Sequence, residues 1–136
     1  MSTAEPVLLD THVLLWWQAE SGRLSQKARD RIAAASQVMV SPISCWEVAT
    51  LVAKGRVELD RPTAKWVQDL LAAPGLGVAE LTPGVATAAG ELTGFHGDPA
   101  DRILYATART SGTTLLSADR QLQTYAASDG TALVTW

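Results

Sequence analysis

Five short runs of aliphatic and β-branched residues recur along this chain, and longer segments with helical spacing separate them. The runs are residues 6–9, 37–40, 77–81, 113–116 and 132–136. Strands that alternate with helices favour a parallel sheet, because parallel neighbours need a long crossover connection. We therefore predict an α/β fold: a single three-layer domain with a mostly parallel central sheet flanked by helices.

Capping signals mark where the helices between these strands begin. Ser25 is a candidate cap for a helix that runs to Ala35, and a cap residue followed by proline recurs at residues 41–42, 82–83 and 98–99. Proline is tolerated in the first turn because its missing N–H has no helical partner there. The predicted helices are 11–18, 25–35, one from 42 that Gly55 ends, 62–73, one from 83, 99–110 and 119–126.

Length and cysteine content narrow the class of protein. The 136 residues suit one domain and not two, so 1–136 is treated as a single domain. Cys45 is the only cysteine, which excludes an internal disulfide and a thiolate zinc cluster and fits a reducing cytoplasm. The longest apolar run, residues 13–17, is far too short for a membrane span, so we expect a soluble cytoplasmic protein.

Net charge does not decide whether the partner is a nucleic acid. The chain has 11 basic and 14 acidic residues, a net charge of −3. If four carboxylates belong to one metal site, the remainder carries a charge of about +1. A polyanionic substrate is neither demanded nor excluded.

Four acidic residues lie where a predicted strand ends and the next predicted helix begins. Asp10 follows the first strand and Asp119 lies just past the fourth, while Glu47 and Asp101 lie in the opening turns of helices. Ligands bind at this carboxyl edge in open α/β sheets. Adjacent carboxylates repel one another unless a cation neutralises them, and an all-oxygen set suits Mg²⁺ or Mn²⁺ rather than zinc.

Each acid also has a structural interpretation. Glu47 fits a capping box with Ser44, and Asp98 has the position of an N-cap. Asp101 and Asp119 fit a favourable charge or cap at a helix N-terminus. Asp10 is the hardest to explain this way, because an unpaired carboxylate beside a core is costly.

Other polar and aromatic residues are open to two readings. His12 could contact the substrate or support the site, or simply be an exposed polar residue. Ser117 could hydrogen-bond a metal-bound water or satisfy a strand end, and Arg102 could bind a phosphate or pair with a site carboxylate. His96 is the second histidine; Lys54, Arg56 and Arg61 are expected to be surface groups, with contact to RNA the lesser alternative. Trp46, Trp66 and one of Trp16 and Trp17 are expected in the core, leaving an exposed tryptophan for a protein-binding surface.

Four segments, in order, resemble the PIN-domain family and most closely its VapC-type toxins: LLDTHVLLWW at 8–17, SPISCWEVATLVAKGRV at 41–57, HGDPADRILYATAR at 96–109 and TLLSADRQL at 114–122. The resemblance implies a metal-dependent endoribonuclease, usually homodimeric and neutralised by a small cognate antitoxin. By motif, the acidic quartet falls on Asp10, Glu47, Asp101 and Asp119, and Ser117 takes the place of the family's small hydroxyl residue. Asp98 is a second acid in its motif, and Asp101 is favoured over it as the ligand.

The residues themselves favour metal-assisted hydrolysis of a phosphodiester. A phospho-aspartate receiver domain is a rival, but it needs a lysine near the end of its last strand, and no lysine follows Lys65. A second rival is a non-catalytic RNA- or protein-binding module on the same fold. Loss of a site acid would favour that module, and none is lost.

Overall fold

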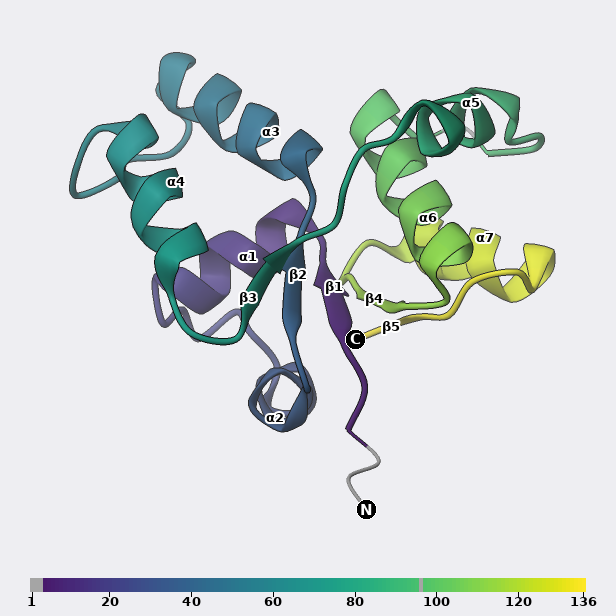
Figure 1. Cartoon of the computed structure of the whole chain (residues 1–136), viewed down its shortest axis with the longest axis horizontal. Helices are drawn as coiled ribbons and strands as arrows, with labels where there is room; N and C mark the ends of the chain where they lie inside the picture. Colours follow the sequence, from purple (N-terminus) through teal and green to yellow (C-terminus); the bar gives the residue numbers. More distant parts are fainter. Residues whose placement is uncertain (1–3, 96) are drawn as a thin grey trace.

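Five parallel strands form one sheet in the computed structural model, which describes residues 4–95 and 97–136 (Figure 1). The strand order is β3-β2-β1-β4-β5. Every neighbouring pair is parallel, which confirms the predicted sheet. The strands are short: β1 Val7–Leu9, β2 Val38–Val40, β3 Leu76–Val78, β4 Thr114–Leu116 and β5 Val134–Thr135.

The predicted caps form where the sequence placed them. Side chains of Ser25, Ser41, Thr82 and Asp98 each accept a hydrogen bond from a backbone N–H in the first turn of the following helix. The helices are α1 Thr11–Gln18, α2 Gln26–Ala34, α3 Pro42–Ala53, α4 Thr63–Ala72, α5 Pro83–Glu91, α6 Pro99–Ser111 and α7 Arg120–Asp129. In the part of the chain described, no helix is long and apolar enough to cross a membrane.

Several predicted boundaries differ from the structure. α7 continues past Ala126 to Asp129 and ends at Gly130, whose φ of 73° is left-handed. The predicted end of α3 is confirmed, because Gly55 follows the C-cap Lys54, has a left-handed φ of 71° and donates its N–H to the carbonyl of Val52. The third strand stops at Val78, because only Leu76–Val78 pairs with β2. The last strand shrinks to two residues for the same reason, since only those pair with β4.

Alternate residues of β1 enter two different apolar layers. Leu9 packs with residues of α1, α2 and α4, whereas Leu8 packs with Leu104 and Tyr105 of α6 and Leu122 of α7. Side chains of a strand point alternately to opposite faces, so the sheet is covered on both sides. Figure 1 shows α1, α3 and α4 grouped on one side of the strands and α5, α6 and α7 on the other. The predicted three layers are confirmed.

The strand order reverses between β1 and β4. The chain moves outward from β1 through β2 to β3, then returns to place β4 on the other side of β1. Leu9 and Leu116 are register partners, so the two strands end side by side. A crevice opens at such a reversal because the following helices leave to opposite faces. The residues after Leu9 and Leu116 therefore meet in this crevice.

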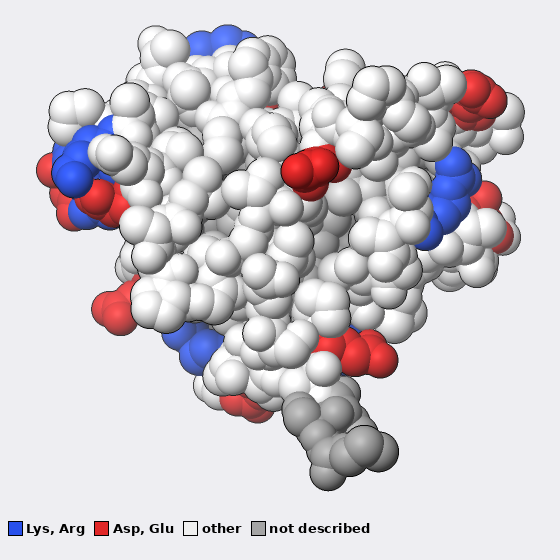
Figure 2. Space-filling model, in the orientation of Figure 1, with Lys and Arg blue, Asp and Glu red and all other residues white. Residues whose placement is uncertain are grey.

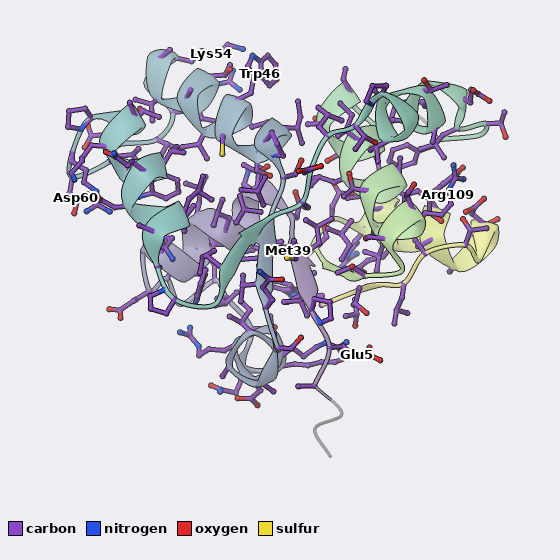
Figure 3. The ribbon with its side chains drawn as sticks, viewed as in Figure 1. Glu5, Met39, Trp46, Lys54, Asp60 and Arg109 are labelled. Atoms are coloured by element: carbon purple, nitrogen blue, oxygen red, sulfur yellow. The ribbon has the colours of Figure 1, made fainter. Side chains whose placement is uncertain are left out.

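The prediction for the tryptophans is right for Trp66 and wrong for Trp46. Trp66 is buried in the core, but Trp46 is 61% exposed. α3 buries Ser44 and Val48, which are four residues apart on one face, and Trp46 lies midway between them on the opposite face. Figure 3 shows Trp46 projecting from α3 away from the sheet. Trp16 and Trp17 are both half-buried against the core.

Candidate functional site

Asp10 is a buried carboxylate at the end of the central strand. It directly follows β1, caps α1 and is only 6% exposed. Its Oδ1 accepts a hydrogen bond from Thr11 N at 2.7 Å, and its Oδ2 accepts one from Ser117 Oγ at 2.6 Å. Burial raises the pKa of Asp10, although both hydrogen bonds act to lower it. The carboxylate is held in a fixed orientation.

Ser117 and Asp119 extend this arrangement from the end of β4. Ser117 Oγ also accepts a hydrogen bond from Asp119 N at 3.1 Å, so one hydroxyl joins both acids. Asp119 Oδ1 accepts bonds from Gln121 N and Leu122 N at 2.8 and 3.2 Å and thereby caps α7. The cap engages only one of the two Asp119 oxygens. The structural and the site interpretations of Asp119 are therefore compatible.

Glu47 enters from α3 and is held by α1. Its Oε1 accepts a hydrogen bond from Thr11 Oγ1, which also lies 2.9 Å from Ser44 Oγ. The alternative of a capping box between Ser44 and Glu47 is wrong, because α3 begins earlier and Ser41 caps it. Burial raises the pKa of Glu47, the bond from Thr11 lowers it, and the charges of Asp98 and Asp10 raise it.

The pKa of Asp101 is affected by the charges of all the other candidate acids. Burial, followed by the charges of Asp98, Asp10, Asp119 and Glu47, raises its pKa to about 7. Asp98 is exposed, and its Oδ1 caps α6 by accepting a bond from Asp101 N at 2.9 Å. The two acids thus differ in place: Asp98 lies at the helix end, and Asp101 is half-buried among the other carboxylates.

The donor set fits a hard divalent cation. The acids supply only oxygen atoms, and their mutual repulsion is what a cation would relieve. Within residues 4–95 and 97–136, however, no three acidic, histidine or cysteine side chains are close enough together to form a ready-made metal cage. The charges of these acids act on one another, but the carboxylates do not form a closed set of ligands in this structure.

The remaining candidate residues are Arg102, His12 and His96. The guanidinium of Arg102 donates to the backbone carbonyls of Ala89, Gly90, Leu92 and Phe95, at 2.7–3.2 Å, and makes no ion pair with a described carboxylate. These bonds favour a structural role over a grip on phosphate. His12 is exposed on α1, and its charge lowers the pKa of both Asp10 and Glu47. His96 lies outside the described residues.

Thr11 is the site residue that sequence reasoning missed. It is fully buried at the start of α1, and it contacts Asp10 through its N–H and Glu47 through its hydroxyl. The available signal was its place directly after Asp10, where a first-turn hydroxyl can reach a neighbouring helix. The partner itself is 36 residues away and carried no signal.

Comparison with known proteins identifies the family of this chain. The PIN-domain family model matches residues 7–128. Ribonuclease VapC22 of Mycobacterium tuberculosis is 42% identical over 120 residues, which cover 88% of this chain and 91% of that protein.

Solved structures share the fold at low sequence identity. They include VapBC2 of Rickettsia felis bound to a promoter DNA fragment (TM-score 0.69, 13% identity, 96% and 98% of the two chains) and FitAcB of Neisseria gonorrhoeae (0.63, 16%, 96% and 96%). A toxin–antitoxin complex from Klebsiella pneumoniae is a third (0.62, 18%, 86% and 89%). With most of its length matched by the family model and by a VapC ribonuclease, the chain belongs to the PIN-domain family and is a homologue of the VapC ribonucleases.

Proposed function

We propose that this chain is a metal-dependent endoribonuclease, with residues 1–136 acting as one nuclease domain and as the toxin of a toxin–antitoxin pair. The observation that carries the proposal is the gathering of Asp10, Glu47, Asp101 and Asp119 at one edge of the sheet. Ser117 joins Asp10 to Asp119, Thr11 joins α1 to Glu47, and the charges of Asp10, Asp119 and Glu47 all act to raise the pKa of Asp101. Such a concentration of negative charge at the switch point of a parallel sheet is suited to a divalent cation, here Mg²⁺ or Mn²⁺.

Asp10, Glu47, Asp101 and Asp119 are the residues that would hold the metal. When bound, a divalent ion supplies positive charge that offsets the charge developing on the phosphodiester and makes water a stronger nucleophile. Ser117 and Thr11 keep Asp10 and Glu47 oriented through their hydroxyl groups. Either Glu47 or Asp119 takes up the proton of the attacking water.

The substrate and partners follow from the relatives. A ribonuclease is 42% identical to this chain, which supports RNA as the substrate. Two of the structures with the same fold are a VapBC assembly and a toxin–antitoxin complex, which supports a small antitoxin protein as a partner. We extend the family's usual homodimer to this chain as part of the proposal.

The decisive experiment incubates the purified chain with a panel of structured RNAs, including tRNAs, in Mg²⁺, in Mn²⁺ and in EDTA. We expect cleavage with either metal, none in EDTA, and none by Asp101→Asn, which should remain folded. Asp30→Asn is the matched control, because it makes the same substitution at an exposed position of α2 and should preserve cleavage. Cleavage by Asp101→Asn at the wild-type rate would remove Asp101 from the mechanism.

The competing function is a non-catalytic RNA-binding module. It predicts that the chain binds RNA with equal affinity in metal and in EDTA and cuts none of the panel. Isothermal titration with Mg²⁺ and Mn²⁺ separates the two functions independently of substrate choice. The proposed nuclease binds these ions and Asp101→Asn weakens that binding, whereas the module has no reason to bind them.

A further inference from the structure

A cleft of about 790 Å³ opens beside the acidic crevice and is not used by the proposed chemistry. It lies between α1 and the segment that joins α3 to α4. Its walls include His12 and Trp16 of α1, Arg23, and Arg56 and Arg61 of the joining segment. Figure 2 shows basic and acidic side chains gathered over this joining segment, near the position of Asp60 that Figure 3 labels.

α1 connects the cleft directly to the acids. Asp10 caps this helix, and Trp16 lies six residues further along, about 9 Å at the helical rise of 1.5 Å per residue. His12 lines the cleft, and its charge acts on both Asp10 and Glu47. An RNA strand bound over the carboxylates would therefore reach the cleft within one or two nucleotides.

The cleft is positively charged although the chain as a whole is acidic. Its walls carry three arginines and two acids, Glu58 and Asp60. Arg61 is neutralised by Asp60 and Asp69, at 3.1 and 3.3 Å. Among the described residues, no carboxylate lies within ion-pair distance of Arg23 or Arg56. Two cationic side chains are thus available to an anion.

The cleft also offers flat surfaces. The guanidinium of Arg23 lies over the Trp16 ring, 5.9 Å from its centre, and the His12 ring lies 6.1 Å from the same ring. Unpaired bases of RNA stack on aromatic rings and on guanidinium planes, while phosphates bind basic side chains. The cleft also has apolar walls that include Leu15, Leu51 and Leu59. Stacking surfaces and apolar walls beside arginines that form no ion pair with a described carboxylate suit a nucleotide, which has both a flat base and a charged phosphate.

We propose that this cleft binds an unpaired nucleotide of the RNA next to the scissile phosphate, its base against Trp16 and Arg23 and its phosphate against Arg56. This inference rests on the proposed ribonuclease function and specifies where part of the RNA binds on the protein. It makes the cleft a determinant of which single-stranded RNA is cut. The metal site held by the acids would cleave the RNA, and the cleft would select the neighbouring base.

The test measures binding without cleavage. Fluorescein-labelled oligo-U, oligo-A and oligo-C are titrated in EDTA with the full chain carrying Asp101→Asn, followed by fluorescence anisotropy. Arg56→Ala should weaken the binding of all three RNAs about tenfold. It should also make the slope of log affinity against log salt concentration shallower by about 0.7, the value for one phosphate contact to a single strand. Arg23→Ala should instead reduce the difference in affinity among the three bases.

Arg109→Ala is the matched control. It removes the same charge from the last turn of α6, on the opposite side of the molecule from Asp60 in Figure 3, and should leave RNA affinity within twofold. Equal affinities of Arg56→Ala and Arg109→Ala would overturn the subsite while leaving the proposed nuclease function untouched. A parent chain that binds none of the three RNAs would contradict the proposed function together with the subsite.

Discussion

Ser117 Oγ donates a 2.6 Å hydrogen bond to Asp10 Oδ2 across 107 positions of sequence, and it fixes the central carboxylate against the neighbouring strand. Because β1 and β4 end side by side, the two residues that follow them are in contact. The bond also acts to lower the pKa of Asp10 against the effect of burial. Ser117 thus links the fold to the chemistry of the site.

Ser117→Ala should weaken both the site and the fold. The buried carboxylate loses its hydroxyl partner, so the free energy of unfolding should fall by about 1–3 kcal/mol and the pKa of Asp10 should rise further. Urea denaturation measures the first effect, and weaker binding of Mg²⁺ in a calorimetric titration reports the second. Ser128→Ala, at an exposed position of α7, is the control and should change neither quantity.

Thr11→Val should impair activity more than stability. Valine has nearly the same volume as threonine but cannot donate to Glu47, so the carboxylate loses its orientation. Loss of such a supporting group costs roughly 10- to 100-fold in activity or metal affinity. Thr11→Ser keeps the hydroxyl and should recover most of the loss. A Thr11→Val variant with unchanged kcat and metal affinity would show that Thr11 only fills space.

The metal-free protein should lose stability as the pH rises through the range in which Asp101 ionises. Its folded pKa of about 7 exceeds the ordinary value of 3.8, so between these values the folded state binds more protons than the unfolded state. Stability therefore decreases from about pH 4 to about pH 7 for this group. Asp101→Asn should remove that part of the slope in denaturation curves recorded in EDTA.

Added Mg²⁺ should oppose this pH dependence. The cation binds the ionised carboxylates, so its affinity should increase as the pH rises through about 7, where Asp101 loses its proton. Melting curves with and without Mg²⁺ at several pH values check this. A melting temperature that responds equally to Mg²⁺ at low and high pH would contradict the role given to Asp101.

Arg102→Met should destabilise the connection between α5 and α6. The variant keeps the aliphatic part of the side chain but removes the guanidinium donor from four backbone carbonyls, of which Ala89 O keeps a bond from Leu92 N. We expect a loss of about 2–4 kcal/mol and faster amide exchange in residues 89–95. Arg109→Met is the control, with an expected change below about 0.5 kcal/mol. An Arg102→Met variant as stable as this control would instead support a role at the substrate.

Trp46→Ala and Trp66→Ala should differ sharply in stability. Trp66 is buried in the core, and its truncation should cost about 3–5 kcal/mol. Trp46 is 61% exposed, so its removal should change the free energy of unfolding by less than about 0.5 kcal/mol. Chemical denaturation of both variants checks this directly. A large loss for Trp46→Ala would mean that an assembly covers this side chain.

The sequence by itself determined the elements, the parallel sheet and the places of the acids. Caps such as Ser25 and Asp98 act on N–H groups within three residues, so the local sequence contains both partners. Asp10 and Asp119 directly follow or closely follow a strand, and in a parallel sheet that alone places them at the same edge. Neighbouring residues were enough for these predictions.

Only the tertiary structure decided which groups touch. The bond from Thr11 to Glu47 spans 36 positions and depends on how α1 packs on α3. The exposure of Trp46 depends on which face of a largely apolar α3 meets the core, and the four carbonyls bound by Arg102 depend on the path of a loop. Such contacts come from the packing of distant segments, whose relative positions no local pattern encodes.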